Sequence, residues 1–120
     1  MADTNTATEV PPERARELIA GGVQLLDVRH PDEHELGHIE GDELVPFDML
    51  SARAESLDRE NALVLYCRSG DRSGAAAQAL RASGYDAYSI EGGLLAWTEQ
   101  GLPIEPPDGT VGQPSGLPPA

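Results

Sequence analysis

The segment ALVLYC, residues 62–67, constrains the fold more than any other part of the chain. Its first five residues are all apolar, as in a parallel strand that is buried on both faces. A short polar loop and then an Ala-rich segment of helical character, residues 73–83, follow it directly. A buried strand that leads into a helix in this way is typical of a parallel sheet covered by helices.

The same alternation continues on both sides of this segment. Residues 23–28 and 85–90 are further runs of strand length, and prolines and glycines delimit the segments between the runs. Asp48 is expected to be an N-cap, and Leu95 and Trp97 to anchor the last helix in the core. Helices are predicted over residues 11–22, 31–37, 48–57, 73–83 and 94–100. The predicted fold class is therefore α/β, with a central parallel sheet and helices on both faces.

The 120 residues are enough for one domain with one core. Residues 1–8 are small and polar, so we expect a flexible N-terminus. Residues 9–101 carry the alternating pattern and form the predicted domain. Residues 102–120 hold six of the ten prolines and no periodic apolar pattern, which predicts a disordered tail rich in Pro and Gly.

The charge balance is strongly acidic, with 21 Asp and Glu residues against 8 basic residues, all of them Arg. A net charge of -13 disfavours nucleic acid and anionic membranes as partners. Two explanations of the acidity stay open, namely solubility and a halophilic adaptation to high internal salt. The sequence has no apolar run of bilayer-spanning length and no signal-peptide pattern, so a cytoplasmic location is expected.

Cys67 is the only cysteine, and it ends the strongest predicted strand. Ligands of such sheets bind at the carboxyl ends of the strands. A thiolate there would be stabilised by loop N–H groups, by the start of the next helix and by the charges of Arg68 and Arg72. A thiolate is a nucleophile. An inert buried thiol is the alternative. Gly70 and the two arginines, all within five residues of Cys67, favour catalysis.

Three motifs resemble the rhodanese family of single-domain sulfurtransferases. The first rhodanese signature resembles LLDVRHPDEHELGHIEG, the active-site loop resembles CRSGDRS, and the closing segment resembles EGGLLAW. Together they span roughly residues 9–101, in family order and spacing. The resemblance implies the rhodanese fold, which is the α/β arrangement predicted above. It also implies a sulfurtransferase that needs no cofactor and binds a small anionic sulfur donor and a thiol acceptor.

The resemblance also implies roles for particular residues. Cys67 would attack the outer sulfur of a thiosulfate-like donor, become a persulfide, and pass the sulfur to a small or protein thiol, or to cyanide. Asp27 and Arg29 would support the loop from below. The residues implied in substrate binding are Arg68, Ser69, Gly70, Asp71, Arg72 and Ser73. Those matching the first signature in a structural role are Glu33, Gly37, His38 and Ile39.

The chain departs from the family pattern at three places. His34 stands where an aromatic residue is usual, and residues 40–42, Glu-Gly-Asp, stand where Pro-Gly-Ala is commoner. These two departures are expected to alter packing and not chemistry. Asp71 places a carboxylate in an anion-binding loop, which bears on the identity of the donor more than on the reaction.

Three other functions compete with sulfur transfer. A cysteine phosphatase or arsenate reductase would place an arginine six positions after the cysteine, where this chain has Ser73. A non-catalytic rhodanese-like module that only binds partners would usually lack Cys67. A metal site on His30, His34 and His38 would need one helix face, but Pro31 and Gly37 are expected to leave the outer two outside that helix. No metal is therefore predicted.

Overall fold

The strands are short because each apolar run is short, and all of them are parallel. The computed structural model describes residues 8–111. Its sheet has the order β1-β5-β4-β2-β3. The strands are β1 (Glu9–Val10), β2 (Gln24–Asp27), β3 (Glu43–Leu44), β4 (Leu63–Tyr66) and β5 (Ala87–Ile90). The helices are α2 (Pro12–Ala20), α3 (Pro31–Leu36), the 3-10 helix η1 (Phe47–Met49), α4 (Leu50–Ala54), α5 (Asp71–Ala82) and α6 (Gly93–Glu99).

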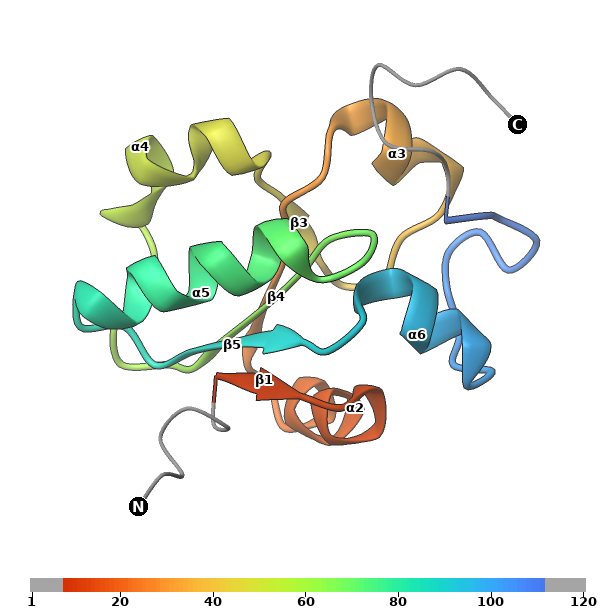
Figure 1. Ribbon diagram of the computed structural model, residues 1–120, viewed down its shortest axis with the longest axis horizontal. Helices are drawn as coiled ribbons and strands as arrows, with labels where there is room; N and C mark the ends of the chain where they lie inside the picture. Colours follow the sequence, from red (N-terminus) through yellow and green to blue (C-terminus); the bar gives the residue numbers. More distant parts are fainter. Residues whose placement is uncertain (1–7, 112–120) are drawn as a thin grey trace.

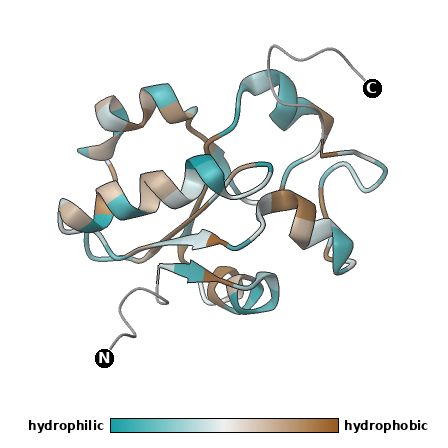
Figure 2. Ribbon diagram, viewed as in Figure 1, coloured by the Kyte–Doolittle hydropathy of each residue, from teal (hydrophilic) through white to brown (hydrophobic). Residues whose placement is uncertain are grey.

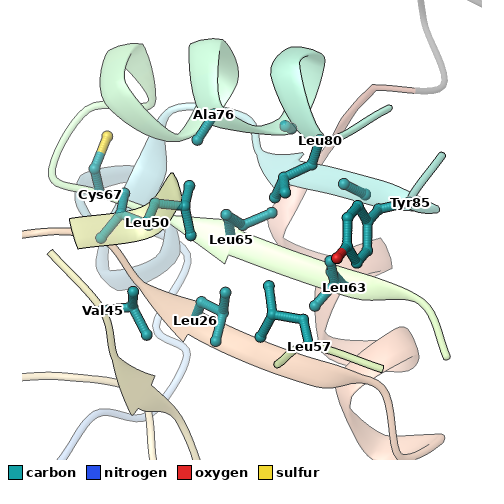
Figure 3. Close-up of a cluster of buried hydrophobic side chains, with 13 residues drawn as sticks. Leu26, Val45, Leu50, Leu57, Leu63, Leu65, Cys67, Ala76, Leu80 and Tyr85 are labelled. Carbon is teal, nitrogen blue, oxygen red and sulfur yellow. The ribbon is translucent and has the colours of Figure 1, made fainter. Parts of the chain in front are cut away.

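Alternating side chains of β4 build two cores, one on each face of the sheet. Leu63, Leu65 and Cys67 belong to the core under α4 and α5, and Figure 3 shows them in one row with Cys67 at its end. Val64 and Tyr66 belong to the core under α2 and α6. Figure 1 shows α5 on one side of the sheet and α2 on the other. The α/β architecture with helices on both faces is therefore confirmed.

Hydropathy marks where the core ends. In Figure 2 the start of α5 is hydrophilic, whereas strand β4, which leads up to it, is hydrophobic. The boundary falls at the loop after Cys67, where a fully buried strand gives way to exposed residues such as Ser69 and Asp71. Among the described residues, no helix has the length and apolar character that a bilayer crossing requires.

Several predicted elements differ in detail. The helix predicted over 48–57 is divided into η1 and α4, with Asp48 inside η1 and not at an N-cap. Leu94, with 0% of its surface exposed, and Trp97 anchor α6, whereas Leu95 is only half-buried. The sequence did not predict β1, because two residues carry no pattern. β1 is held by pairing with β5, where Glu9 lies opposite Ser89.

The expectation of disorder from residue 102 is wrong for residues 102–111, which lie against the domain. Ile104 is 9% exposed in the α2/α6 core, and Pro103 accepts a hydrogen bond from Trp97 Nε1 at 2.8 Å. The backbone of Glu105 pairs with that of His38. Figure 1 shows this segment, in blue, beside α3. Hydrogen bonds and the apolar side chains of Leu102, Ile104 and Val111 hold the segment, although its sequence has no helical or strand periodicity. Residues 1–7 and 112–120, which include the rest of both predicted flexible ends, lie outside the described residues.

Candidate active site

The candidate site lies at the carboxyl ends of the central strands. Cys67 directly follows β4, and Asp27 ends the neighbouring strand β2, where it lies opposite Tyr66. Because all five strands are parallel, their carboxyl ends share one edge of the sheet. The loop from Cys67 to α5 therefore lies where sheets of this kind place their ligands.

Three hydrogen-bond donors converge on the sulfur of Cys67, which is 1% exposed. Gly70 N lies 3.1 Å, Ser73 N 3.4 Å and Ser73 Oγ 3.5 Å from Cys67 Sγ. Donors that face one atom stabilise negative charge on it. The arrangement can therefore hold a thiolate, or the anionic sulfur species formed on it.

Gly70 makes this loop geometry accessible. Its φ of 103° is in the left-handed region, and it is the N-cap of α5. The helix therefore begins at Asp71, two residues before the predicted start at Ser73. A Cβ at Gly70 would also lie 3.3 Å from the backbone nitrogen of Gly92. A larger residue here would strain the loop and press it against the start of α6.

The start of α6 fixes the other side of the loop. Leu94 N donates to Cys67 O at 2.8 Å, and Leu95 N donates to Arg68 O at 3.0 Å. Gly93 permits this approach, because an added Cβ would lie 2.5 Å from Arg68 O and 2.6 Å from Cys67 O. The EGG motif and the cysteine loop thus form one packed unit.

Arg72 is held in place by Glu33 of α3. Arg72 Nη1 and Nη2 each lie 3.3 Å from a carboxylate oxygen of Glu33, whose side chain is 1% exposed. Burial lowers the pKa of Arg72, but the hydrogen bond and charge of Glu33, and the charge of Cys67, outweigh it and raise the pKa overall. The guanidinium therefore stays charged beside the sulfur.

The remaining loop side chains lie nearer to solvent. Arg68 is half-buried, whereas Ser69 and Asp71 are exposed. Asp71 lies in the first turn of α5, where the helix dipole stabilises a carboxylate. The loop thus presents charges of both signs toward solvent around a buried sulfur.

Asp27 and Arg29 form a buried pair with both side chains 0% exposed. Arg29 Nε and Nη2 donate to the two carboxylate oxygens of Asp27 at 2.9 and 2.8 Å. Arg29 also donates to Gly37 O at 2.6 Å and to Val111 O at 2.9 Å. These contacts hold the end of α3 and the C-terminal segment, and the hydrogen bonds of the pair do not reach the Cys67 sulfur. Burial lowers the pKa of Arg29, but Asp27 outweighs it and the pKa is raised.

Sequence reasoning missed Ser89 and assigned Glu33 only a structural role. Ser89, on β5, is 0% exposed, and its Oγ lies 2.8 Å from Ser73 Oγ. The available signal in the sequence was a polar serine within the last predicted strand, residues 85–90. Glu33 lies 39 residues from Arg72 in the sequence, so no local pattern reveals their contact.

The comparison with known families now decides the assignment. The model of the rhodanese-like domain matches residues 11–100. The chain belongs to the rhodanese-like family. Its relatives include the uncharacterized protein YqhL of Bacillus subtilis, 41% identical over 75 residues that cover 62% of this chain and 60% of YqhL. The chain thus spans less than two thirds of the length of YqhL.

Another relative matches along nearly its whole length. The thiosulfate sulfurtransferase GlpE of Pseudomonas paraeruginosa is 31% identical over 111 residues, covering 92% of this chain and 97% of GlpE. Among solved structures, the rhodanese-related protein of Thermoplasma volcanium superposes with a TM-score of 0.75 at 30% identity. That match covers 80% of this chain and 95% of the archaeal one. Family and fold therefore agree.

Proposed function

We propose that this rhodanese-like chain is a sulfurtransferase that carries sulfane sulfur as a persulfide on Cys67. One observation carries the proposal, namely that Gly70 N, Ser73 N and Ser73 Oγ all face Cys67 Sγ within 3.5 Å. Donors so placed favour both the thiolate nucleophile and an anionic persulfide. The relative named thiosulfate sulfurtransferase supports a thiosulfate-like donor.

The reaction has two balanced steps. In the first, the thiolate of Cys67 attacks the outer sulfur of thiosulfate, a new S–S bond forms, and the S–S bond of thiosulfate breaks as sulfite leaves with the electron pair. In the second, an acceptor thiolate or cyanide attacks the terminal sulfur. The bond to Cys67 then breaks, the Cys67 thiolate is restored, and a new persulfide or thiocyanate is released.

The arginines are assigned to the donor anion. Arg72 is charged and held by Glu33, and Arg68 lies in the same loop. Asp71 is exposed at the loop and opposes an anionic donor by its charge. Asp71→Asn is therefore expected to lower KM for thiosulfate, whereas Arg68→Ala and Arg72→Ala are expected to raise it. Asp27 and Arg29 act as supports below this set.

The test is thiosulfate–cyanide sulfur transfer by the full chain and by Cys67→Ser. We expect thiocyanate from the wild type, none from the variant, and matched circular dichroism spectra. Mass spectrometry of the wild type after thiosulfate should show a gain of one sulfur atom. Thiocyanate from folded Cys67→Ser would overturn the mechanism, since the chain has no second cysteine. A wild type that never gains sulfur would instead favour the non-catalytic module, and hydrolysis of p-nitrophenyl phosphate would favour a phosphatase.

A further inference from the structure

A second cluster of functional side chains lies around the end of α3. Ligand-type atoms of His34, His38 and Asp42 all lie within 4.8 Å of one another. The sequence argued against a histidine cluster on one helix, and His30 is indeed the exposed N-cap of α3, outside the helix itself. His38 also lies beyond the helix, but the turn at Gly37 returns its ring onto that of His34. The two rings stack with centroids 3.9 Å apart and planes 19° apart.

Carboxylates orient both imidazoles. His34 Nδ1 lies 2.9 Å from Asp27 Oδ2, and His38 Nδ1 lies 2.9 Å from Asp42 Oδ1. His38 Nδ1 also lies 3.1 Å from Ile39 O. Carboxylate and carbonyl oxygens accept hydrogen bonds, so each Nδ1 carries a proton. In the neutral form of each imidazole, Nε2 then keeps its lone pair. This carboxylate–histidine arrangement is the one that orients metal-binding histidines in proteins.

The two Nε2 atoms are accessible. Among residues 8–111, every buried side-chain nitrogen or oxygen has a hydrogen-bond partner. The hydrogen bonds of His34 and His38 are made through Nδ1 in each ring. Both Nε2 atoms therefore reach solvent, in agreement with side-chain exposures of 21% and 27%. Rings stacked this closely also keep the two Nε2 atoms near each other.

The surrounding charge favours a cation. Asp27 and Asp42 have side chains that are 0% and 1% exposed, and Arg29 balances one of the two charges. Tyr66 donates its hydroxyl proton to Asp42 at 2.6 Å but adds no charge. A divalent cation beside the imidazoles would compensate this excess negative charge.

We propose that His34 and His38 bind a divalent transition-metal ion through their Nε2 atoms. Asp27 and Asp42 orient the two rings, and water fills the other coordination positions. Imidazole ligands suit zinc, copper and nickel. Because the rings stack 19° from parallel, binding one ion through both Nε2 atoms requires the exposed ring edges to turn toward each other. The site uses two of the positions at which this chain departs from its family pattern, His34 and Asp42. The hydrogen-bond donors that face the Cys67 sulfur are on Gly70 and Ser73 and do not belong to it.

Zinc titration of the full chain carrying Cys67→Ser tests the site, because this background removes the thiolate as a ligand and makes the result independent of sulfur transfer. Isothermal titration calorimetry should show one Zn²⁺ ion per chain. His34→Ala and His38→Ala should each raise the Kd for Zn²⁺ at least about tenfold. His30→Ala is the matched control, since it removes an exposed histidine beside the site, and its Kd should stay within about twofold of the parent.

Two further measurements separate ligation from a folding effect. Asp42→Asn keeps the side-chain shape but loses the orienting charge, so the Kd should rise by about 10- to 100-fold. In the parent chain, long-range ¹⁵N NMR should show Zn²⁺ shifting the Nε2 resonances of two histidines while their Nδ1 atoms stay protonated. The proposal is overturned if Zn²⁺ does not bind, if His34→Ala and His38→Ala bind it as tightly as the parent, or if the NMR spectra show ligation through Nδ1.

Discussion

The hydroxyl group of Ser89 on β5 lies 2.8 Å from that of Ser73 on α5. Ser73 Oγ lies in turn 3.5 Å from Cys67 Sγ and 3.4 Å from Gly70 O. Each hydroxyl has one proton to donate. When Ser89 donates to Ser73, the proton of Ser73 is available to the sulfur. Strand β5, on the far side of β4 from β2, is thereby connected to the Cys67 sulfur.

Ser89→Ala should therefore slow the reaction of Cys67 with iodoacetamide. Without Ser89 the hydrogen bond from Ser73 to the thiolate weakens, which destabilises the thiolate by about 1 kcal/mol. The alkylation rate should then fall roughly fivefold at acidic pH, where the fraction of thiolate limits the reaction. In a Ser73→Ala background the same change should have no further effect, and Ser89→Thr should keep the wild-type rate. Equal rates for Ser89→Ala and the wild type would contradict the relay.

Arg72→Ala should destabilise the fold because it leaves the Glu33 carboxylate, 1% exposed, without its cation. We expect a loss of about 2 kcal/mol in the free energy of unfolding, measured with urea. The double variant Arg72→Ala with Glu33→Gln should recover at least half of that loss, since no unpaired charge remains. A double variant no more stable than Arg72→Ala would show that the pair does not contribute through its charge.

Tyr66 should make the fold sensitive to alkaline pH. Burial, together with the charges of Asp27 and Asp42, raises the pKa of Tyr66 far above its usual 10. Above pH 10 the unfolded chain loses the phenol proton while the folded chain keeps it, so stability falls by up to about 1.4 kcal/mol per pH unit. Tyr66→Phe lacks this dependence. At pH 8 the variant is less stable than the wild type, because Ile39 N and Asp42 Oδ2 lose the Tyr66 hydroxyl as a partner. This difference in stability should narrow as pH rises to 11. A constant difference across this range would refute the assignment.

The segment after α6 should contribute to stability. A chain ending at Gly101 loses the buried side chain of Ile104, the acceptor of Trp97 and the acceptor of Arg29 at Val111. Compared with a chain ending at Val111, it should be at least about 2 kcal/mol less stable in urea unfolding. Identical unfolding curves for the two truncations would show that the packing of residues 102–111 adds nothing.

The excess of carboxylates should make stability depend on salt. With 21 acidic and 8 basic residues, raising KCl from dilute to molar concentration screens repulsion and should raise Tm by about 4 °C or more. Replacing the exposed Glu40, Glu55 and Glu99 by Gln should raise Tm at low salt and flatten the dependence. A Tm that stays level or falls with KCl would leave solubility as the reason for the acidity.

The parts of the fold with a local signal were predictable. The α/β architecture was predicted from the apolar runs of β2, β4 and β5 and from the Pro and Gly residues between them. The loop was predicted from Cys67 and the nearby Gly70. These signals are local in the sequence, because a strand buried on both faces must be apolar along its length and a tight turn needs glycine.

The rest depends on contacts between distant residues. Glu33 meets Arg72, Ser89 meets Ser73, and Val111 meets Arg29, 82 residues away. A single sequence holds no pattern for such pairs. The segment 102–111 was misjudged for the same reason, since its proline content resembles that of a disordered tail although hydrogen bonds to Trp97 and Arg29 hold it.

The two outer strands of the sheet are the shortest, since β1 and β3 have two residues each. Edge strands are where another molecule adds a strand of its own, and such pairing begins many aggregation pathways. Within the described residues, each edge strand offers only two residues to an incoming chain, while the longer apolar strands lie protected between them. The strand order that brings the Cys67 loop to the centre of the sheet thus also keeps the fully buried, apolar strand Leu63–Tyr66 from pairing with other molecules.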